Sequence, residues 1–438
     1  MHKNDSAMQW NRLLNPSRLG EQKVASLQEI AEDRNPFEMD YGRILFSNPF
    51  RRLHNKTQVF PMPENDHVHS RLTHSLEVAN VGQTLGKMVG RRILKKQNLE
   101  HVQAEHFGQI VATACLAHDI GNPPFGHHGE KAIGDFFAKH FKLNVMQNFC
   151  SEQQQKDLIH FEGNAQGFRM LTRLHMCKDA GGLRLTMAVL AAFSKYPQSC
   201  MNRHSKGRPG GKKFGFYHSE ELLFEQIAEA CGLLPVEGLN KAWHRHPLAY
   251  LMEAADDICY QILDLEDGVT LKLLTKDHFA ALIQPMIKAN ISHWDVSRIR
   301  ATAINNLINE VVEVFMQQED ALLHGQGQMP LMDLIPSASS IQALNNVAVQ
   351  SCYRAPIVVK REVAASQVIE SLLEHLVASA RQEKHPGLLP TLLGDRMPSE
   401  AANFYEVLQT IADFICGMTD RYALSLYRQL NGMDLAMA

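Results

Sequence analysis

The chain has 438 residues, of which 45% are apolar and 21% charged, and its 44 Lys and Arg against 47 Asp and Glu give a formal net charge of −3. This composition is too apolar for a disordered chain and too balanced in charge for a tail that coats nucleic acid. The length exceeds that at which one core usually stops growing, so two lobes and one large helical domain both fit. The 22 His residues stand out, because His is the commonest metal ligand.

The eight Cys residues predict reduced, buried thiols. They form no CxxC pair and several lie inside apolar helical runs, which argues against a disulfide framework or a zinc ribbon. The N-terminal stretch lacks the apolar region of a signal peptide, and no window approaches the ~20 apolar residues that span a bilayer. We therefore expect a cytoplasmic protein without membrane contact.

Helical periodicity dominates the chain, and it predicts an all-α fold. Apolar residues recur mostly three or four apart over 72–93, which places them on one face of a helix. Strand signals are short and confined to GRILFSNPF (42–50) and APIVVK (355–360). Similar helical patterns cover residues 106–119, 128–141, 219–231, 248–266, 296–317, 363–381 and 401–430.

Three stretches interrupt this pattern. GNPPFG (121–126) must end the helix before it, because proline cannot continue a helix. The basic, Gly-rich loop NRHSKGRPGGKKFG (202–215) is either a plain surface excursion or a contact for phosphate or single-stranded nucleic acid. HGQGQMPLMD (324–333) is a candidate linker to a C-terminal helical lobe.

A His-Asp dipeptide, His118 and Asp119, closes the helix that GNPPFG ends. Adjacent helical residues point about 100° apart, so they converge only on something held at close range between them, such as a metal ion with bonds of ~2 Å. His74 lies on an earlier helix, and LMEAADDICYQIL (251–263) places two adjacent aspartates in an apolar run. An unpaired carboxylate there would be costly to bury, and a metal ion is the simplest partner for it.

In LMEAADDICYQIL, either of two adjacent aspartates, Asp256 or Asp257, could be the metal ligand. Asp256, Tyr260 and Asp264 are four apart and line one stripe of a helix, whereas Asp257 points about 100° away from that stripe.

The order His, His-Asp, Asp resembles the HD superfamily of metal-dependent phosphohydrolases, and the longer strings resemble its dGTPase branch, the deoxynucleotide triphosphohydrolases. The resemblance implies a helical HD core over 61–270, an N-terminal segment 1–60 packed on it and a C-terminal helical lobe over 271–438. It also implies hydrolysis of a dNTP to the deoxynucleoside and inorganic triphosphate. The strings are RRLHNKTQVFP (51–61), HSRLTHSLEVA (69–79), HDIGNPPFGHHGE (118–130), FEGNAQGFR (161–169), KYP (195–197), HPLAYLMEAADDICYQILDLEDG (246–268) and GMTDRYA (417–423).

By this resemblance the metal ligands are His74, His118, Asp119 and Asp256. Asp256 is preferred to Asp257, because the family places a sugar-contacting Tyr and Asp four and eight residues after the ligand. Two imidazoles and two carboxylates suit Mn²⁺ or another transition metal, while Mg²⁺ could bridge the phosphates in addition.

His127 and Glu130 resemble the catalytic dyad of the family. His127 lies nine residues after His118, beyond the Pro-Pro turn, and Glu130 is one helical turn further on. Glu130 could therefore bind the imidazole, raise its pKa and fix its tautomer. Attack on the α-phosphate needs a proton at the departing O5′, and His127 could act as acid, base or nucleophile.

Substrate contacts follow from the same resemblance. Arg71, one turn before His74, is placed to bind the α-phosphate. Arg421 is a candidate phosphate ligand that could reach a neighbouring subunit, or else the ion-pair partner of Asp420. The remaining expected contacts are Lys195 and Tyr196 to phosphate, and Gln58, Val59, Tyr260 and Asp264 to sugar and base.

Two other functions stay open. Another HD-type nucleotidase or phosphodiesterase is disfavoured, since GNPPFG follows the dipeptide where a signalling HDxxED enzyme would carry acidic residues. A single-stranded nucleic-acid-binding regulator with a vestigial site is disfavoured by the near-zero net charge and the intact ligands. The family also implies a homo-oligomer, commonly a hexamer.

Overall fold

The computed structural model describes residues 7–21, 28, 35–58, 69–143, 149–174, 182–203, 211–327, 329–350, 356–399 and 401–434. Within these ranges the chain forms α-helices joined by turns and short 3₁₀ segments, and β-structure is limited to isolated bridges. The predicted all-α fold is confirmed.

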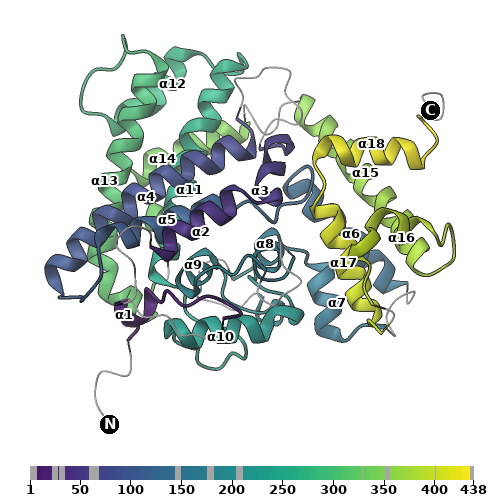
Figure 1. Cartoon of the computed structure of the whole chain (residues 1–438). Coiled ribbons are helices and arrows are strands. Elements are labelled where there is room, and N and C mark those ends of the chain that lie inside the picture. Colours follow the sequence, from purple (N-terminus) through teal and green to yellow (C-terminus); the bar gives the residue numbers. More distant parts are fainter. Residues whose placement is uncertain are drawn as a thin grey trace.

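The larger apolar core surrounds α4 (Arg71–Lys96), α5 (Ala104–Ala117) and α11 (Pro247–Thr270), which pack directly on one another. Figure 1 shows these helices in the left and central part of the molecule. The other helices on this core are α1 (Trp10–Leu13), α2 (Pro36–Leu45), α3 (Asn48–Arg52), α9 (Met187–Phe193), α10 (Glu221–Cys231), α12 (Lys276–Ile283), α13 (Val296–Leu323) and α14 (Ala338–Ala348).

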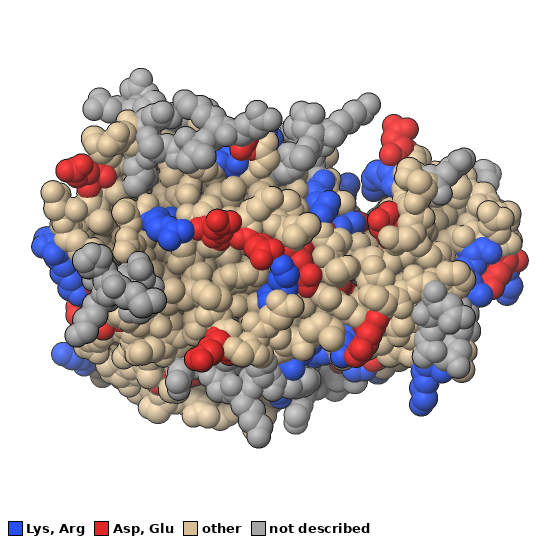
Figure 2. All heavy atoms as spheres, turned by 90° about the horizontal axis from the view of Figure 1, so that it is seen from below, with Lys and Arg blue, Asp and Glu red and all other residues tan. Residues whose placement is uncertain are grey.

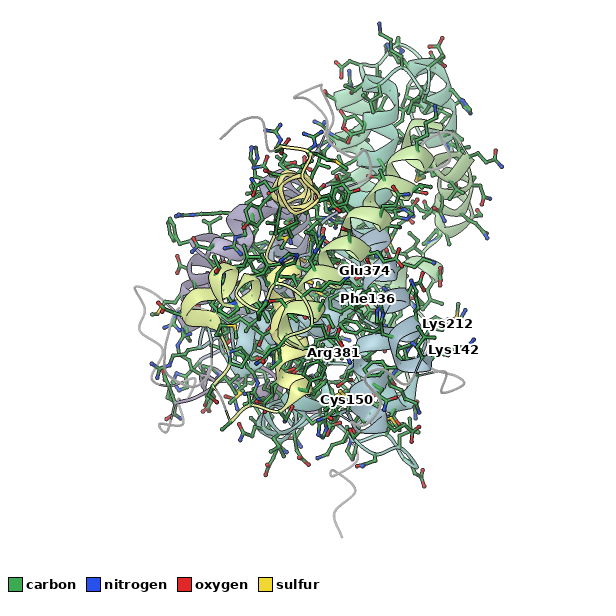
Figure 3. All side chains as sticks on the ribbon, turned by 90° about the vertical axis from the view of Figure 1, so that its right-hand side faces the viewer. Phe136, Lys142, Cys150, Lys212, Glu374 and Arg381 are labelled. Atoms are coloured by element: carbon green, nitrogen blue, oxygen red, sulfur yellow. The ribbon has the colours of Figure 1, made fainter. Side chains whose placement is uncertain are left out.

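A second apolar core lies on the right in Figure 1. It joins α6 (His127–Lys142) and α7 (Glu152–Ile159) to helices from the C-terminal part of the chain. Figure 3 views this side, where α6 packs on α15. The C-terminal helices of this core are α15 (Pro356–Ala380), α16 (Leu388–Leu393), α17 (Phe404–Cys416) and α18 (Asp420–Leu430).

One helix, α8 (Gly163–Thr172), contributes to both cores. Its Phe168 belongs to the larger core, whereas Met170 belongs to the second. The two cores therefore meet along α8, and membership in a core does not follow the order of the chain.

Local capping places the ends of the site helices. Ser70 and Thr73 form a capping box, in which the Ser70 hydroxyl accepts from the Thr73 amide at 3.3 Å, and this starts α4 three residues before His74. The Pro-Pro turn ends α5 at Ala117, so His118 is its capping residue. Gly126, with φ 60°, then allows the chain to start α6 at His127.

Some local expectations differ from the structure. Most of the strand-like GRILFSNPF is helical, because Asn35 and Ser47 cap α2 and α3, and a proline is the first residue of α2 and the second residue of α3. The helical pattern over 401–430 is two helices, since the Thr419 hydroxyl caps a new start at Asp420. In 356–360, most of the other strand-like segment, the backbone opens α15.

The thiol prediction is confirmed for the six cysteines that the structure describes, all of which are free and buried. Cys177 and Cys352 lie outside the described residues. None of the described helices combines the length and apolar character that a bilayer crossing needs.

An ion-pair network centred on Arg169 of α8 ties the second core to the loop before α10. Its guanidinium donates to both oxygens of Asp413 at 3.0 Å and to Glu220 at 2.7 Å. Replacing Arg169 by Met should cost about 3 to 5 kcal/mol, because it leaves the carboxylate of Asp413, whose side chain is only 10% exposed, without its cation. Urea unfolding followed by circular dichroism measures this loss.

Lys131→Met is the matched control, because Lys131 pairs with Asp135 at 2.5 Å while 74% of its side chain is exposed. Its loss should not exceed about 1 kcal/mol. Equal losses for the two variants would contradict the role assigned to Arg169.

Candidate metal centre and active site

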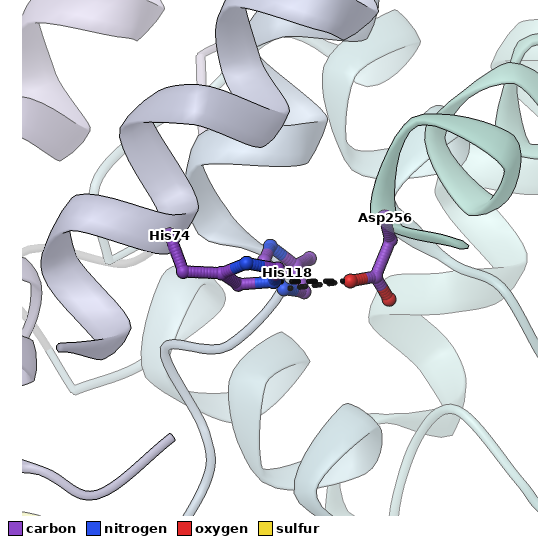
Figure 4. A group of neighbouring side chains, drawn as sticks. All are labelled: His74, His118 and Asp256. Carbon is purple, nitrogen blue, oxygen red and sulfur yellow. Dashed lines mark hydrogen bonds and ion pairs between the residues drawn. The ribbon is translucent and has the colours of Figure 1, made fainter. Parts of the chain in front are cut away.

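Three of the predicted metal ligands converge on one point. His74 on α4, His118 at the end of α5 and Asp256 on α11 each offer a ligand atom within 4.8 Å of the other two (Figure 4). The Asp256 Oδ1 atom lies 3.2 Å from His74 Nε2 and 3.5 Å from His118 Nε2. Asp257, its neighbour, lines the adjacent pocket and does not join this group.

The backbone fixes the tautomer of His118. Its Nδ1 atom lies 2.7 Å from the carbonyl oxygen of Cys115, which can only accept a hydrogen bond. Nδ1 therefore carries a proton, and in the neutral ring this leaves the lone pair on Nε2 directed at Asp256.

Asp119, the fourth predicted ligand, lies beside the group but is held by other partners. Its Oδ2 atom accepts from Arg71 at 2.7 Å and lies 3.4 Å from His118 Nε2. Its other oxygen accepts from Asn122. Metal ligation by Asp119 stays a prediction, and it would require Asp119 to share its oxygens with Arg71.

The charges of the site suit a cation between them. Burial opposes ionisation of Asp256, but His118, His74 and Lys195 hold the pKa of its carboxyl below the usual range. Burial likewise lowers the pKa of His118, but Asp119 and Asp256 outweigh it and raise that pKa to about 9. Ionised carboxylate facing imidazole nitrogen is the donor set of divalent transition metals, so the residues fit such an ion.

Asp257 has a different environment from Asp256. Burial, reinforced by the charges of Asp256 and Glu253, raises the pKa of Asp257 to about 7, although Lys195 opposes this. A carboxyl that ionises so reluctantly is a weaker metal ligand than Asp256.

A pocket of about 420 Å³ opens next to the metal-ligand group, which is the predicted set His74, His118 and Asp256. Its volume is within the range of small-molecule sites. It brings together residues that lie far apart in the sequence. Its lining comprises Thr57, Gln58, Arg71, His118, Asp119, Phe125, Gly126, His127, His128, Asp256, Asp257, Tyr260 and Glu362.

His127 and Glu130 form a hydrogen-bonded pair at this pocket. His127 Nδ1 lies 2.7 Å from Glu130 Oε2, and the other Glu130 oxygen accepts from the Gly163 amide at 2.7 Å. Glu130 is thus held on both sides, and it raises the pKa of the His127 imidazole, which is 74% exposed. A Cβ at position 163 would lie 2.4 Å from Glu130 Oε1, so this close approach requires glycine.

The turn before α6 has an unusual backbone. Phe125 and Gly126 have φ of 65° and 60°, values that cost strain at a non-glycine residue. A Cβ at Gly126 would lie 2.6 Å from Arg71 Nη2. The turn therefore leaves room for the Arg71 guanidinium at the pocket.

The other predicted contacts are spread around the site. Lys195 lies 3.7 Å from Asp256 and 3.8 Å from Glu253, and the ring of Tyr196 stacks with Arg245 at 5.3 Å. Asp264 is buried on α11, Arg421 is exposed on α18, and Val59 lies outside the described residues.

Several residues that shape the pocket were not anticipated. Asp420 is buried and accepts from the amides of Thr57 and Phe125, both at 3.0 Å, so it joins α18 to two walls of the pocket. Lys56 is buried and donates to the carbonyl oxygens of Asn122 and Cys416, both at 2.6 Å. The sequence signal for Asp420 is its place in GMTDRYA, beside the predicted phosphate ligand Arg421.

The sequence also does not predict a contact between α6 and α15 at the pocket. His128 of α6 lies 2.7 Å from Glu362 of α15, and both line the cavity. The C-terminal helix α15 therefore contributes directly to the wall of this pocket.

Comparison with known proteins agrees with this geometry. The HD domain family matches residues 71–153, and the phosphohydrolase-associated domain matches residues 336–429. Proteins named deoxyguanosinetriphosphate triphosphohydrolase-like, from Synechocystis sp. and Pseudomonas aeruginosa, are 40% and 39% identical, covering 98% and 97% of this chain and 100% and 99% of their own. A deoxyguanosinetriphosphate triphosphohydrolase of Salmonella paratyphi A is 29% identical over 91% of this chain and 94% of its own. The chain therefore belongs to the deoxyguanosinetriphosphate triphosphohydrolase-like family of HD-domain phosphohydrolases.

Proposed function

We propose that this protein hydrolyses deoxynucleoside triphosphates, dGTP among them, to the deoxynucleoside and inorganic triphosphate with the help of a divalent metal. The observation that carries the proposal is the shared pocket. Three of the predicted metal ligands, His118, Asp119 and Asp256, line it together with Arg71 and His127, and Glu130 holds the His127 imidazole at 2.7 Å. The names of the relatives support the same substrate class.

His74, His118 and Asp256, with Asp119 as a fourth ligand, would hold the metal. Mn²⁺ or another transition metal fits these ligands, with Mg²⁺ as a further candidate on the phosphates. When bound, the ion supplies Lewis acidity at the α-phosphate and makes a nucleophile available from water near neutral pH.

Arg71 would bind the α-phosphate. Its Nη1 atom already donates to Asp119, but a guanidinium has five N–H donors and matches phosphate oxygens in pairs. Arg71 would therefore hold the phosphate and the ligand Asp119 at the same time.

His127 would move the proton. Water adds its oxygen to the α-phosphorus while the bond from phosphorus to O5′ breaks. The protonated imidazole gives its proton to O5′, and the proton released by water restores the imidazolium. Glu130 favours this protonated form, because it raises the pKa of His127.

Gln58 and Tyr260 line the pocket and would bind the sugar. The Gln58 Oε1 atom is buried and has no hydrogen-bond partner among the described residues, so it is a ready acceptor for the 3′-hydroxyl. Asp264, Val59, Lys195, Tyr196 and Arg421 stay predicted substrate contacts.

A homo-hexameric assembly and a cytoplasmic location remain predictions. The buried free thiols support the cytoplasmic location. On the face drawn in Figure 2, acidic and basic side chains of the described residues are interspersed, which does not favour binding of single-stranded nucleic acid. Residues 204–210 of the basic loop lie outside the described part of the chain.

Product analysis tests the proposal. The Mn²⁺-loaded protein, incubated with each dNTP alone and with pairs of dNTPs, should release inorganic triphosphate and deoxynucleoside from at least one of them. Phosphorus NMR distinguishes this product from pyrophosphate or single phosphate. Release of either of those from every dNTP that is turned over would instead indicate another HD-type nucleotidase.

A single substitution separates proton transfer from metal binding. His127→Ala should lower kcat by about 10²- to 10⁴-fold, the contribution of a general acid, and leave the metal content per chain unchanged. Elemental analysis and steady-state kinetics on the same sample measure both quantities.

His118→Ala is the control, because it should lose metal and turnover together. Glu130→Gln tests the direction of the pKa shift of His127. Without the carboxylate this pKa falls, so His127 loses its proton at lower pH. The alkaline limb of the pH profile of kcat should therefore move to lower pH. Loss of metal in His127→Ala would make His127 a ligand and refute its proposed role.

A further inference from the structure

A second pocket, of about 320 Å³, lies where α3, α8, α16 and α17 meet, at the seam between the two apolar cores. It shares no described lining residue with the pocket at the metal-ligand group. It is therefore a separate cavity with its own chemistry.

The charged side chains of this pocket are mostly arginines. Arg52, Arg169 and Arg396 line it, and Asp413 is the carboxylate among them. Both Asp413 oxygens already accept from Arg169, at distances of 3.0 to 3.1 Å. The negative charge of Asp413 is thus paired with Arg169.

Arg52 and Arg396 have no carboxylate partner among the residues that the structure describes. Arg52 donates to the carbonyl oxygen of Gly417 at 2.9 Å, and Arg396 makes only long bonds, of 3.3 and 3.4 Å, to backbone oxygens. Each guanidinium has five N–H donors, so most of them stay available. Burial and repulsion by Arg396 lower the pKa of Arg52, so the two guanidinium groups are close enough to interact electrostatically.

The remaining wall of the pocket is apolar. Met170, Leu393 and Phe414 are buried there, and Leu174 is 41% exposed. The Arg396 guanidinium lies 5.2 Å from the centre of the Phe414 ring, in a cation–π contact that fixes its orientation.

We propose that this pocket binds a phosphate monoester of a small apolar or aromatic molecule. The phosphate would lie between Arg52 and Arg396, and the apolar body would pack against Phe414, Leu393 and Met170. A phosphate dianion matches two cations in charge and accepts paired N–H donors from each guanidinium, whereas a carboxylate would leave one cation unmatched.

Titration calorimetry with phenyl phosphate tests this site in the Mn²⁺-loaded full chain. Wild type should show a binding event that persists in Arg71→Gln, where the metal pocket is altered, and weakens at least tenfold in Arg396→Gln. Arg396 is exposed, so its replacement should leave the fold intact, and circular dichroism verifies this. Arg52→Gln should weaken the same event at least tenfold.

Benzoate is the matched probe, with the same ring and a single charge, and it should bind at least tenfold more weakly than phenyl phosphate. Absence of binding in wild type, unchanged affinity in Arg396→Gln, or loss of the event in Arg71→Gln would each overturn the site. Equal affinity for benzoate would overturn the assignment to phosphate. The outcome is independent of the hydrolysis assay, because binding is measured without a dNTP.

Discussion

The Asp256 carboxylate, ionised in the apolar middle of α11, imposes the arrangement of the larger core. A carboxylate removed from most of its water is destabilising without partners, and Asp256, whose side chain is 25% exposed, finds its partners in His74 and His118, at the ends of two other helices. Helices α4, α5 and α11 must therefore pack so that these three side chains meet. A site that concentrates ionisable groups in this way gains most when a divalent cation occupies it.

The second core completes the site from the other side. Asp420 of α18 fixes Thr57 and Phe125, and Glu362 of α15 pairs with His128 across the pocket. The pocket is thus closed by helices from the end of the chain, although the metal-ligand residues come from its first part and its middle. Accordingly α6, the next helix after α5 in the chain, packs on α15.

The sequence predicts the helices well, because apolar periodicity reports which face of each segment is buried. It also predicts His74, His118 and Asp256 as neighbours, but through family strings and not through spacing. It does not indicate that Arg71 holds Asp119, because that contact joins the ends of two helices. Apolar periodicity shows which face of a helix is buried, but not which helices pack together. For the same reason the sequence does not predict the role of Asp420 at the pocket. A buried aspartate at a helix start resembles an ordinary cap until its contacts with Thr57 and Phe125 are known.

We propose that His74, His118, Asp119 and Asp256 hold one divalent ion beside His127 and Arg71. Anomalous diffraction from crystals of the protein grown with Mn²⁺ tests it most directly. We expect a single strong peak at bonding distance from His74 Nε2, His118 Nε2 and Asp256, with Asp119 as the fourth protein ligand. A peak bound by Asp257 or His127 in place of these residues, or no peak at this position in Mn²⁺-saturated crystals, would contradict it.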